Sequence, residues 1–185
     1  MEKKKLSNDV FMYPMPVALL GTKMGDKSNF MALGWVTRLN GNPPLLGIGV
    51  NRVHHTDQLL RENRKFSINF PPADLIEKVD FCGIASGKDT DKSDLFNVYY
   101  GDFDVPLIEE CSLSIECLLR DIYEMETHDL FIGEIVAAYS EEKYMSDGKL
   151  DMAKMDPLLL TMPDNNYWKV GEKAGKAWSI GRALK

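Results

Sequence analysis

Five residues of this 185-residue chain could together hold a negatively charged group. Thr56 stands where it would cap a helix, whose unpaired amides and positive dipole end attract anions. Arg52 precedes that helix, and a polar loop supplies Ser86, Lys88 and Lys92. Each residue also has a simpler interpretation, because a threonine is most often only a cap and a loop lysine is most often solvated. The spacing therefore indicates a phosphate-binding site as one of two open interpretations.

A second group of residues could accommodate a flat aromatic ring. Trp35 lies in an apolar segment that Asn29, Gly34 and Thr37 interrupt, and small residues beside an aromatic let a planar ligand approach backbone amides. His128 opens a later strand directly after a polar turn. A tryptophan on a strand belongs more often to the core, and a histidine after a turn is more often merely exposed. The pattern alone leaves these alternatives open.

Several familiar catalytic and metal-binding motifs are absent from the sequence. No GxGxxG opens a helix after a strand, which argues against a Rossmann nicotinamide domain. The segment 83–89 (GIASGKD) has one residue too few between its glycines for a P-loop, and Asp89 stands where Ser or Thr is needed. The three histidines and three cysteines lack metal-like spacing, and an odd number of cysteines gives no disulfide framework. We expect no metal site.

The composition restricts the class of protein. Hydrophobic residues make up 44% and charged residues 27% of the chain, and the formal net charge is −6. This acidity argues against nucleic-acid binding, and no apolar run approaches the roughly 18 residues of a transmembrane helix. The lysine-rich start leads into a stretch that Asn8, Asp9, Pro14 and Pro16 interrupt, unlike a signal peptide. We expect one soluble, cytoplasmic domain that acts on small molecules or protein partners, without nucleic acid or membrane.

The elements that must position the candidate residues are mainly strands. Apolar or alternating segments bounded by turn residues predict strands over 16–23, 29–37, 43–50, 65–70, 111–125, 128–140 and 158–160. The first two form a probable hairpin, and most neighbours are joined by short turns. Antiparallel pairing and a small barrel follow more easily than a parallel sheet.

Two helices and one irregular stretch separate these strands. The spacing predicts a helix over 55–63 that is capped by Thr56. A second helix begins at Asp74, with Glu77 three residues on as in a capping box. The polar stretch 83–104 is irregular, with a short helix at 91–96.

Seven segments of the chain, taken in order, resemble a known family. They are PVALLGTK, NFMALGWVT, PPLLGIGV, the pattern R-x-x-H-T, FSINF, DFCGIASGKDTDKS and HDLFIGEI. Together they are similar to the flavin reductase-like, FMN-binding split-barrel family, and especially to its flavoredoxin-type branch. The resemblance implies a single domain over 1–185, with a core at about 10–170 and a C-terminal extension at 171–185. It implies a mainly β fold, a six-stranded antiparallel Greek-key split barrel with peripheral helices, and a homodimer that binds FMN near the subunit interface.

The resemblance also implies roles for particular residues. Asn29 and Trp35 would meet the flavin, while Thr56 and Lys92 would hold its phosphate with help from Ser86. His128 would reach in from the partner subunit. A C-terminal aromatic, Tyr167 or Trp168, would complete the pocket. Thr37, Arg52 and Lys88 join these cofactor-binding candidates from the residue pattern.

The chain departs from the family pattern at two places. Gly34 stands where the family commonly has serine or alanine before the tryptophan, and Asp91-Lys92-Ser93 lacks the usual aromatic residue. These departures leave open the shape of the pocket over the flavin, and that shape selects the electron partner.

The leading functional hypothesis is an FMN-dependent oxidoreductase. It would take electrons from NAD(P)H or a protein donor and pass them to flavin, a ferric chelate or a redox protein. One alternative is an electron carrier with tightly held FMN and no NAD(P)H turnover of its own. Others keep the barrel but change the ligand, either to haem or deazaflavin or to a molecule with no redox role.

Overall fold

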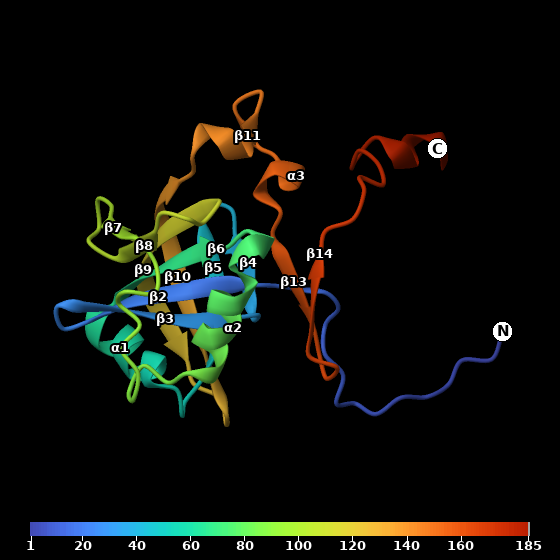
Figure 1. The fold of residues 1–185 in the computed structure, drawn as a ribbon. Coiled ribbons are helices and arrows are strands. Elements are labelled where there is room, and N and C mark those ends of the chain that lie inside the picture. Colours follow the sequence, from blue (N-terminus) through green and yellow to red (C-terminus); the bar gives the residue numbers. More distant parts are fainter. Residues whose placement is uncertain (185) are drawn as a thin grey trace.

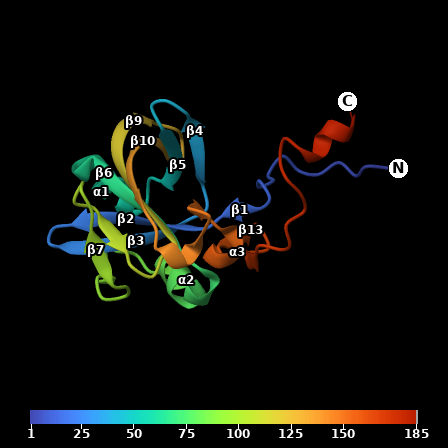
Figure 2. The ribbon, with the colours of Figure 1, turned by 90° about the horizontal axis from the view of Figure 1, so that it is seen from above.

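The computed structural model describes residues 1–184 and centres on one curled antiparallel sheet of seven strands (Figure 1). In spatial order they are β3 (Lys27–Leu33), β2 (Ala18–Met24), β6 (Lys65–Phe70), β9 (Leu113–Tyr123), β10 (His128–Tyr139), β5 (Leu45–Asn51) and β4 (Val36–Asn40). The edge strands β3 and β4 are joined by only Gly34 and Trp35, so the sheet curls until its two edges meet at one end (Figure 2). No ladder pairs β3 with β4 in the described chain, and the barrel is therefore split along this seam.

The mainly β split-barrel fold is confirmed, but the sheet has seven strands rather than six. The segment 29–37, predicted as one strand, is divided between β3 and β4. The carbonyl oxygen of Trp35 accepts a hydrogen bond from the Gly49 amide at 2.9 Å, so the chain has already reached β5 before β4 begins. Gly34 interrupts the segment at the break, but both halves carry residues typical of strands, so the sequence alone did not separate them.

Two apolar clusters pack on opposite faces of the sheet. Leu20, Phe66 and Phe131 are fully buried inside the barrel. Leu19 belongs to the second cluster, which lies between the sheet and the helix α2 (Ile76–Ile84). Neighbouring residues of β2 therefore face opposite sides, as the period of two requires.

The first helix, α1 (His55–Asn63), has the predicted limits but not the predicted cap. His54 occupies the N-cap position and makes no side-chain capping bond. Thr56 is buried within the first turn, where its hydroxyl accepts a hydrogen bond from Asn29 Nδ2 at 3.2 Å. A partner on a distant strand thus takes the hydroxyl that we expected to cap the helix.

The second helix also starts differently from the prediction. A 3-10 turn (Ala73–Leu75) precedes α2, and neither segment has a side-chain cap, so the capping box of Asp74 and Glu77 does not form. The Ala73 amide instead donates to the carbonyl oxygen of Asp156 at 2.8 Å. The predicted helix at 91–96 is likewise wrong, because this part of the loop consists of turns.

The remaining elements are short and lie around the barrel. They are β1 (Met15–Pro16), β7 (Val98–Tyr100), β8 (Pro106–Ile108), β11 (Met145–Ser146), β12 (Lys149–Leu150), α3 (Met152–Met155), β13 (Leu158–Thr161), β14 (Asn166–Lys169) and 3-10 turns at Glu142–Tyr144 and Ile180–Leu184. Strands β1, β13 and β14 form a separate three-stranded sheet, from which both terminal segments project on the same side (Figure 1). Within residues 1–184 no helix has the length and apolar character to cross a membrane.

Candidate functional site

Two adjoining hollows beside β3 bring most of the candidate residues together. One has a volume of about 300 Å³ and lies between the start of α1 and the loop after α2. The other, of about 270 Å³, lies at the β3–β4 seam. Both are lined by Met31, Ala32 and His54, so they form one continuous depression, which we call the groove.

Lys92 provides a buried positive charge at one end of the groove. Its side chain is 3% exposed, and Nζ donates to the carbonyl oxygens of Phe30 at 2.6 Å and Ala85 at 2.8 Å. Burial lowers the pKa of this ammonium group. It forms no ion pair with any described residue, and an ammonium group has three protons to donate. The groove therefore presents a cation that lacks a counter-charge.

Asn29, Thr56 and Gly87 enclose the same end. Asn29 is 1% exposed and donates from Nδ2 to Thr56 Oγ1, while its Oδ1 has no hydrogen-bond partner among the described residues. The Thr56 hydroxyl accepts this bond and keeps its own proton for a ligand. The loop lies so close that a Cβ on Gly87 would come within 2.1 Å of Asn29 Oδ1. Together with the uncapped start of α1, these groups form a site that suits an anion.

Ser86, Lys88 and Arg52 are the other three candidates for an anion site, and not all of them line the groove. Ser86 lines it, and its Oγ accepts a hydrogen bond from the Lys88 amide at 3.2 Å. The Lys88 side chain is exposed and is not part of the lining. Arg52 is also outside the lining, because its Nε donates to Asp129 Oδ1 at 2.8 Å.

Trp35 and His128 form the opposite end of the groove. Their ring centroids are 4.4 Å apart with the ring planes inclined by 38°, and Trp35 remains 41% exposed. A Cβ on Gly49 would approach Trp35 Cε3 to 3.0 Å, so the glycine lets the indole lie directly on β5. Oγ1 of Thr127 lies 3.0 Å from His128 Nδ1. Within its own chain His128 therefore lies beside Trp35, and its entry into the site from a partner subunit stays a prediction.

A buried carboxylate fixes the turn that carries His128. Asp129 accepts hydrogen bonds from Arg52 Nε and from the Met125 amide at 3.0 Å, and it also pairs with Arg61. Burial acts to raise the pKa of Asp129, but these hydrogen bonds and the two arginine charges outweigh it and lower the pKa. Arg52 therefore helps to fix the turn that carries His128, although Arg52 itself does not line the groove.

Thr37 lies in a third hollow, which shares Gly34, Trp35 and Gly49 with the hollow at the β3–β4 seam. This hollow has a volume of about 550 Å³, and its remaining walls are largely apolar. The segment from Val10 to Pro16 forms one of those walls. Thr37 thus adjoins the groove at Trp35 without lining it.

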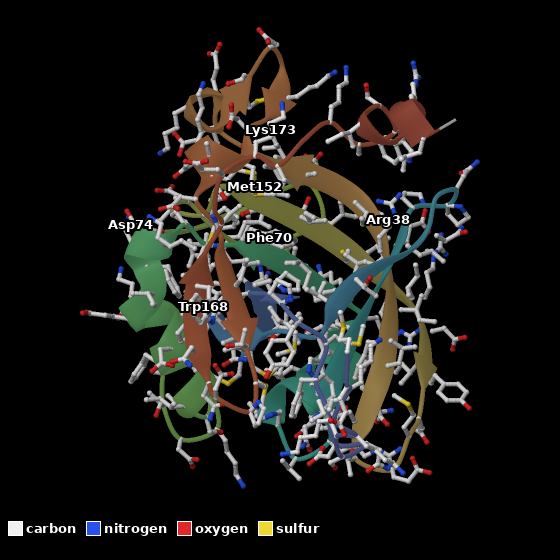
Figure 3. The ribbon with its side chains drawn as sticks, turned by 90° about the vertical axis from the view of Figure 1, so that its right-hand side faces the viewer. Arg38, Phe70, Asp74, Met152, Trp168 and Lys173 are labelled. Carbon is white, nitrogen blue, oxygen red and sulfur yellow. The ribbon has the colours of Figure 1, made fainter. Side chains whose placement is uncertain are left out.

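The two C-terminal aromatic candidates do not line the groove of their own chain. Both are on β14, in the hairpin on which Figure 3 labels Trp168. The Tyr167 hydroxyl donates to Asp80 Oδ1 at 3.1 Å, and burial together with Asp80 raises the pKa of Tyr167 to about 12. Trp168 Nε1 donates to Thr161 Oγ1 at 2.9 Å.

Sequence reasoning missed His54, which lines both hollows of the groove. Its position directly before the predicted helix was the available signal, because an N-cap residue borders the anion-attracting end of a helix. The cap was assigned to Thr56 instead, and His54 received no role.

Comparisons with known proteins show the family and the fold to which the chain belongs. A family model described as the flavin reductase like domain matches residues 10–161. The chain is similar to the crystal structure of a flavoredoxin from Methanosarcina acetivorans, with 53% identity, 100% coverage of both chains and a TM-score of 0.97. It is also similar to a flavoredoxin of Desulfovibrio vulgaris, with 30% identity, coverage of 98% of this chain and 100% of that chain, and a TM-score of 0.90.

A third similar structure is an FMN-binding protein from Thermus thermophilus with bound 1-cyclohex-2-enone. It has 27% identity and a TM-score of 0.80, with coverage of 95% of this chain and 97% of that chain. The family match spans most of the chain, and the two flavoredoxins share its architecture almost from end to end. The chain therefore belongs to the flavin reductase-like family of flavin-binding redox proteins, and it resembles the flavoredoxin-type branch of that family.

Proposed function

We propose that the groove binds FMN and that the chain is an FMN-dependent oxidoreductase. The observation that carries this proposal is the chemistry of the two ends of one groove. A buried ammonium group without a counter-charge, Lys92, marks one end, and an exposed indole, Trp35, marks the other. FMN has a phosphate at one end and a planar ring at the other. The similar structures described as flavoredoxins and as an FMN-binding protein support the same choice.

The residues of this chain would divide the work of binding between them. Lys92, Thr56, Asn29 and Ser86 would hold the phosphate, while Trp35 and His128 would contact the ring. When bound, FMN supplies the redox chemistry by accepting and releasing electrons, and the protein supplies orientation and electrostatics. The exposure of Trp35 keeps the ring end open to a donor or an acceptor.

The electron donor in this proposal is NAD(P)H or a redox protein. The acceptor is free flavin, a ferric chelate or a second redox protein. No acidic residue lines the groove among the described residues, so the lining adds no negative charge that would repel a negatively charged donor, despite the net charge of −6. The free, buried state of Cys82, Cys111 and Cys117 supports a reducing, cytoplasmic compartment.

We also propose that the chain is a homodimer. The projecting terminal segments carry large apolar side chains that are mostly exposed, among them Leu6, Val10, Met12, Trp178 and Ile180. Figures 1 and 2 show both segments on one side of the molecule, where a second copy would cover them. The expected C-terminal aromatic contact would then come from Tyr167 or Trp168 of that second copy. Light scattering should give the mass of a dimer, and a monomer at micromolar concentration would refute this part.

The binding test uses two lysines of the same loop. Replacing Lys92 by alanine should weaken FMN binding by about tenfold to hundredfold, as for the loss of one charge-assisted hydrogen bond. Lys88→Ala is the matched control, because its side chain is exposed and outside the groove. FMN affinity is measured by fluorescence quenching. Equal affinity in both variants would contradict the phosphate site.

The redox test uses the absorbance of the FMN-loaded protein. Anaerobic addition of NADH or NADPH should bleach the flavin bands, and steady turnover with an acceptor would establish the enzyme. Flavin bands that neither nucleotide bleaches would instead support an electron carrier fed by a protein donor. A Soret band in the purified protein would show haem and overturn the cofactor.

A further inference from the structure

His54 stands between the two ends of the groove and has no role in the proposal above. It lines both hollows, so its ring lies where the anionic and aromatic ends meet. Its backbone is fixed on both sides, since its amide donates to the Asn51 carbonyl at 3.0 Å and its carbonyl accepts from the Asp57 amide at 3.1 Å. Within residues 1–184, neither ring nitrogen has a hydrogen-bond partner. An accessible ring on a fixed backbone, with two unused nitrogens at the wall of the groove, is suited to bind a ligand.

The charges around His54 are all positive or neutral. The groups that face it are Lys92 from the loop after α2 and His128 from β10. His55 and Cys82 complete the titratable lining, and burial raises the pKa of Cys82 to about 11, which keeps that thiol uncharged. Removal of the ring from water lowers the pKa of His54, and His128 and Lys92 lower it further. These effects favour the neutral imidazole when no ligand is bound.

An anion in the groove would reverse this balance. A phosphate placed between Lys92 and His54 screens the lysine charge and favours the protonated imidazole. We propose that His54 is a further ligand of the FMN phosphate, which it binds as an imidazolium ion after taking one proton from solvent. This inference rests on the proposed FMN site and adds a residue and a proton to it. Binding of FMN then becomes coupled to pH.

The sign of the coupling follows from linkage. His54 gains a proton in the complex. Its contribution to FMN affinity is therefore fully present at low pH and is lost as pH rises through the pKa of His54 in the bound state. FMN affinity should rise by about tenfold from about pH 8.5 to 6.5, the size of one charge-assisted hydrogen bond. This range lies above the second ionisation of a phosphate monoester at about pH 6, so the ligand itself changes little. Riboflavin has no phosphate and should show no such rise.

The experiment measures FMN and riboflavin affinities across this pH range for the wild-type protein and three variants. His54→Gln should bind FMN with an affinity that hardly changes with pH. His54→Lys carries a charge throughout the range and should bind FMN tightly with an equally flat profile. His128→Gln is the control at the ring end, where both flavins should lose affinity alike while the FMN-specific pH dependence persists.

Calorimetry in two buffers with different ionisation enthalpies gives an independent readout of the proton. Wild-type protein should take up a fraction of one proton per FMN near pH 7, and His54→Gln should take up less. An unchanged pH profile and proton uptake in His54→Gln would overturn the inference while leaving the FMN site intact. The same pH profile for riboflavin would place the proton at the ring rather than at the phosphate, and would also overturn it. Failure of the wild-type protein to bind either flavin would overturn the proposed function and this inference together.

Discussion

The two ends of the groove are built in opposite ways. At the proposed phosphate end Asn29 and Lys92 are almost wholly buried, and the hydrogen bonds that they donate to three separate segments hold them in place. At the ring end Trp35 is 41% exposed and is held by a stacked histidine and a glycine that makes room for it. The difference separates two tasks. In the proposed FMN complex, the buried end would anchor the phosphate, and the exposed end would leave the ring accessible to electron partners.

The largest expected effect concerns the support of the ring end. Asp129→Ala removes a buried carboxylate that accepts hydrogen bonds from Arg52, Arg61 and the Met125 amide, and we expect a loss of about 3 kcal/mol in the free energy of unfolding, as for hydrogen bonds to a charged group. Urea denaturation measures this loss. Glu124→Gln is the control, because Glu124 pairs with the same Arg61 from an exposed position and should cost about 0.5 kcal/mol or less. If Asp129→Ala loses as little stability as Glu124→Gln, the buried carboxylate is not needed to support the ring end.

The next effect would break the anchoring end. Gly87→Ala forces a methyl group to within 2.1 Å of Asn29 Oδ1, so the loop must move. Overpacking of this kind costs about 1–3 kcal/mol, and we expect FMN affinity to fall by about tenfold. Gly41→Ala serves as the control because nothing lies within 4 Å of the added carbon. Retained FMN affinity in Gly87→Ala would mean that the loop is not rigid.

A smaller effect is expected at the exposed end. Trp35→Ala removes a ring contact worth about 0.5–1.5 kcal/mol, so flavin affinity should fall by about threefold to tenfold. The loss should be the same for FMN and riboflavin, because the contact involves the ring alone. Fluorescence quenching by both ligands tests this. A loss confined to FMN would show that the two ends do not act separately.

The smallest effect concerns an exposed pair next to the anchor. Hydrogen bonds from Lys27 and Ser93 hold the pKa of Asp91 well below its usual range. Asp91 therefore stabilises the folded protein at pH values above its pKa in the unfolded chain, and this stabilisation is lost as pH falls through its pKa in the folded protein. Lys27→Met should therefore reduce resistance to acid unfolding only slightly, and less so in high salt. FMN affinity at neutral pH should not change measurably. A clear loss of affinity would extend the anchoring end to this surface pair.

Local patterns predicted some elements to the residue. The helix 55–63 and the strand 65–70 were correct because their apolar periods are complete within each segment. The division of 29–37 could not be predicted, since only pairing of β4 with β5 reveals that the chain crosses the seam. Strand count is therefore a property of long-range pairing, which no local pattern contains.

The candidate site shows the same limit. Thr56 and Lys92 were identified by type and spacing, and both line the groove. The predicted capping role of Thr56 was wrong because Asn29, 27 positions away, takes its hydroxyl. His54 was missed for a related reason, since its place between Lys92 and His128 depends on segments that meet only in the folded chain. The cofactor roles of all these residues stay predictions until the binding tests are made.

The two-residue connection at Gly34 and Trp35 has a consequence for the order of folding. Strands β2 to β5 are consecutive in sequence and form two hairpins, yet they occupy both edges of the sheet. The later strands β6, β9 and β10 fill the space between β2 and β5. The contacts within a hairpin join residues that are close in sequence, so the loop-closure entropy that they cost is small. The two hairpins over 18–51 can therefore form first, and they already contain both edge strands of the barrel. We therefore expect insertion of β6, β9 and β10 to be the slow step of folding, with Trp35 at the connection between the two hairpins.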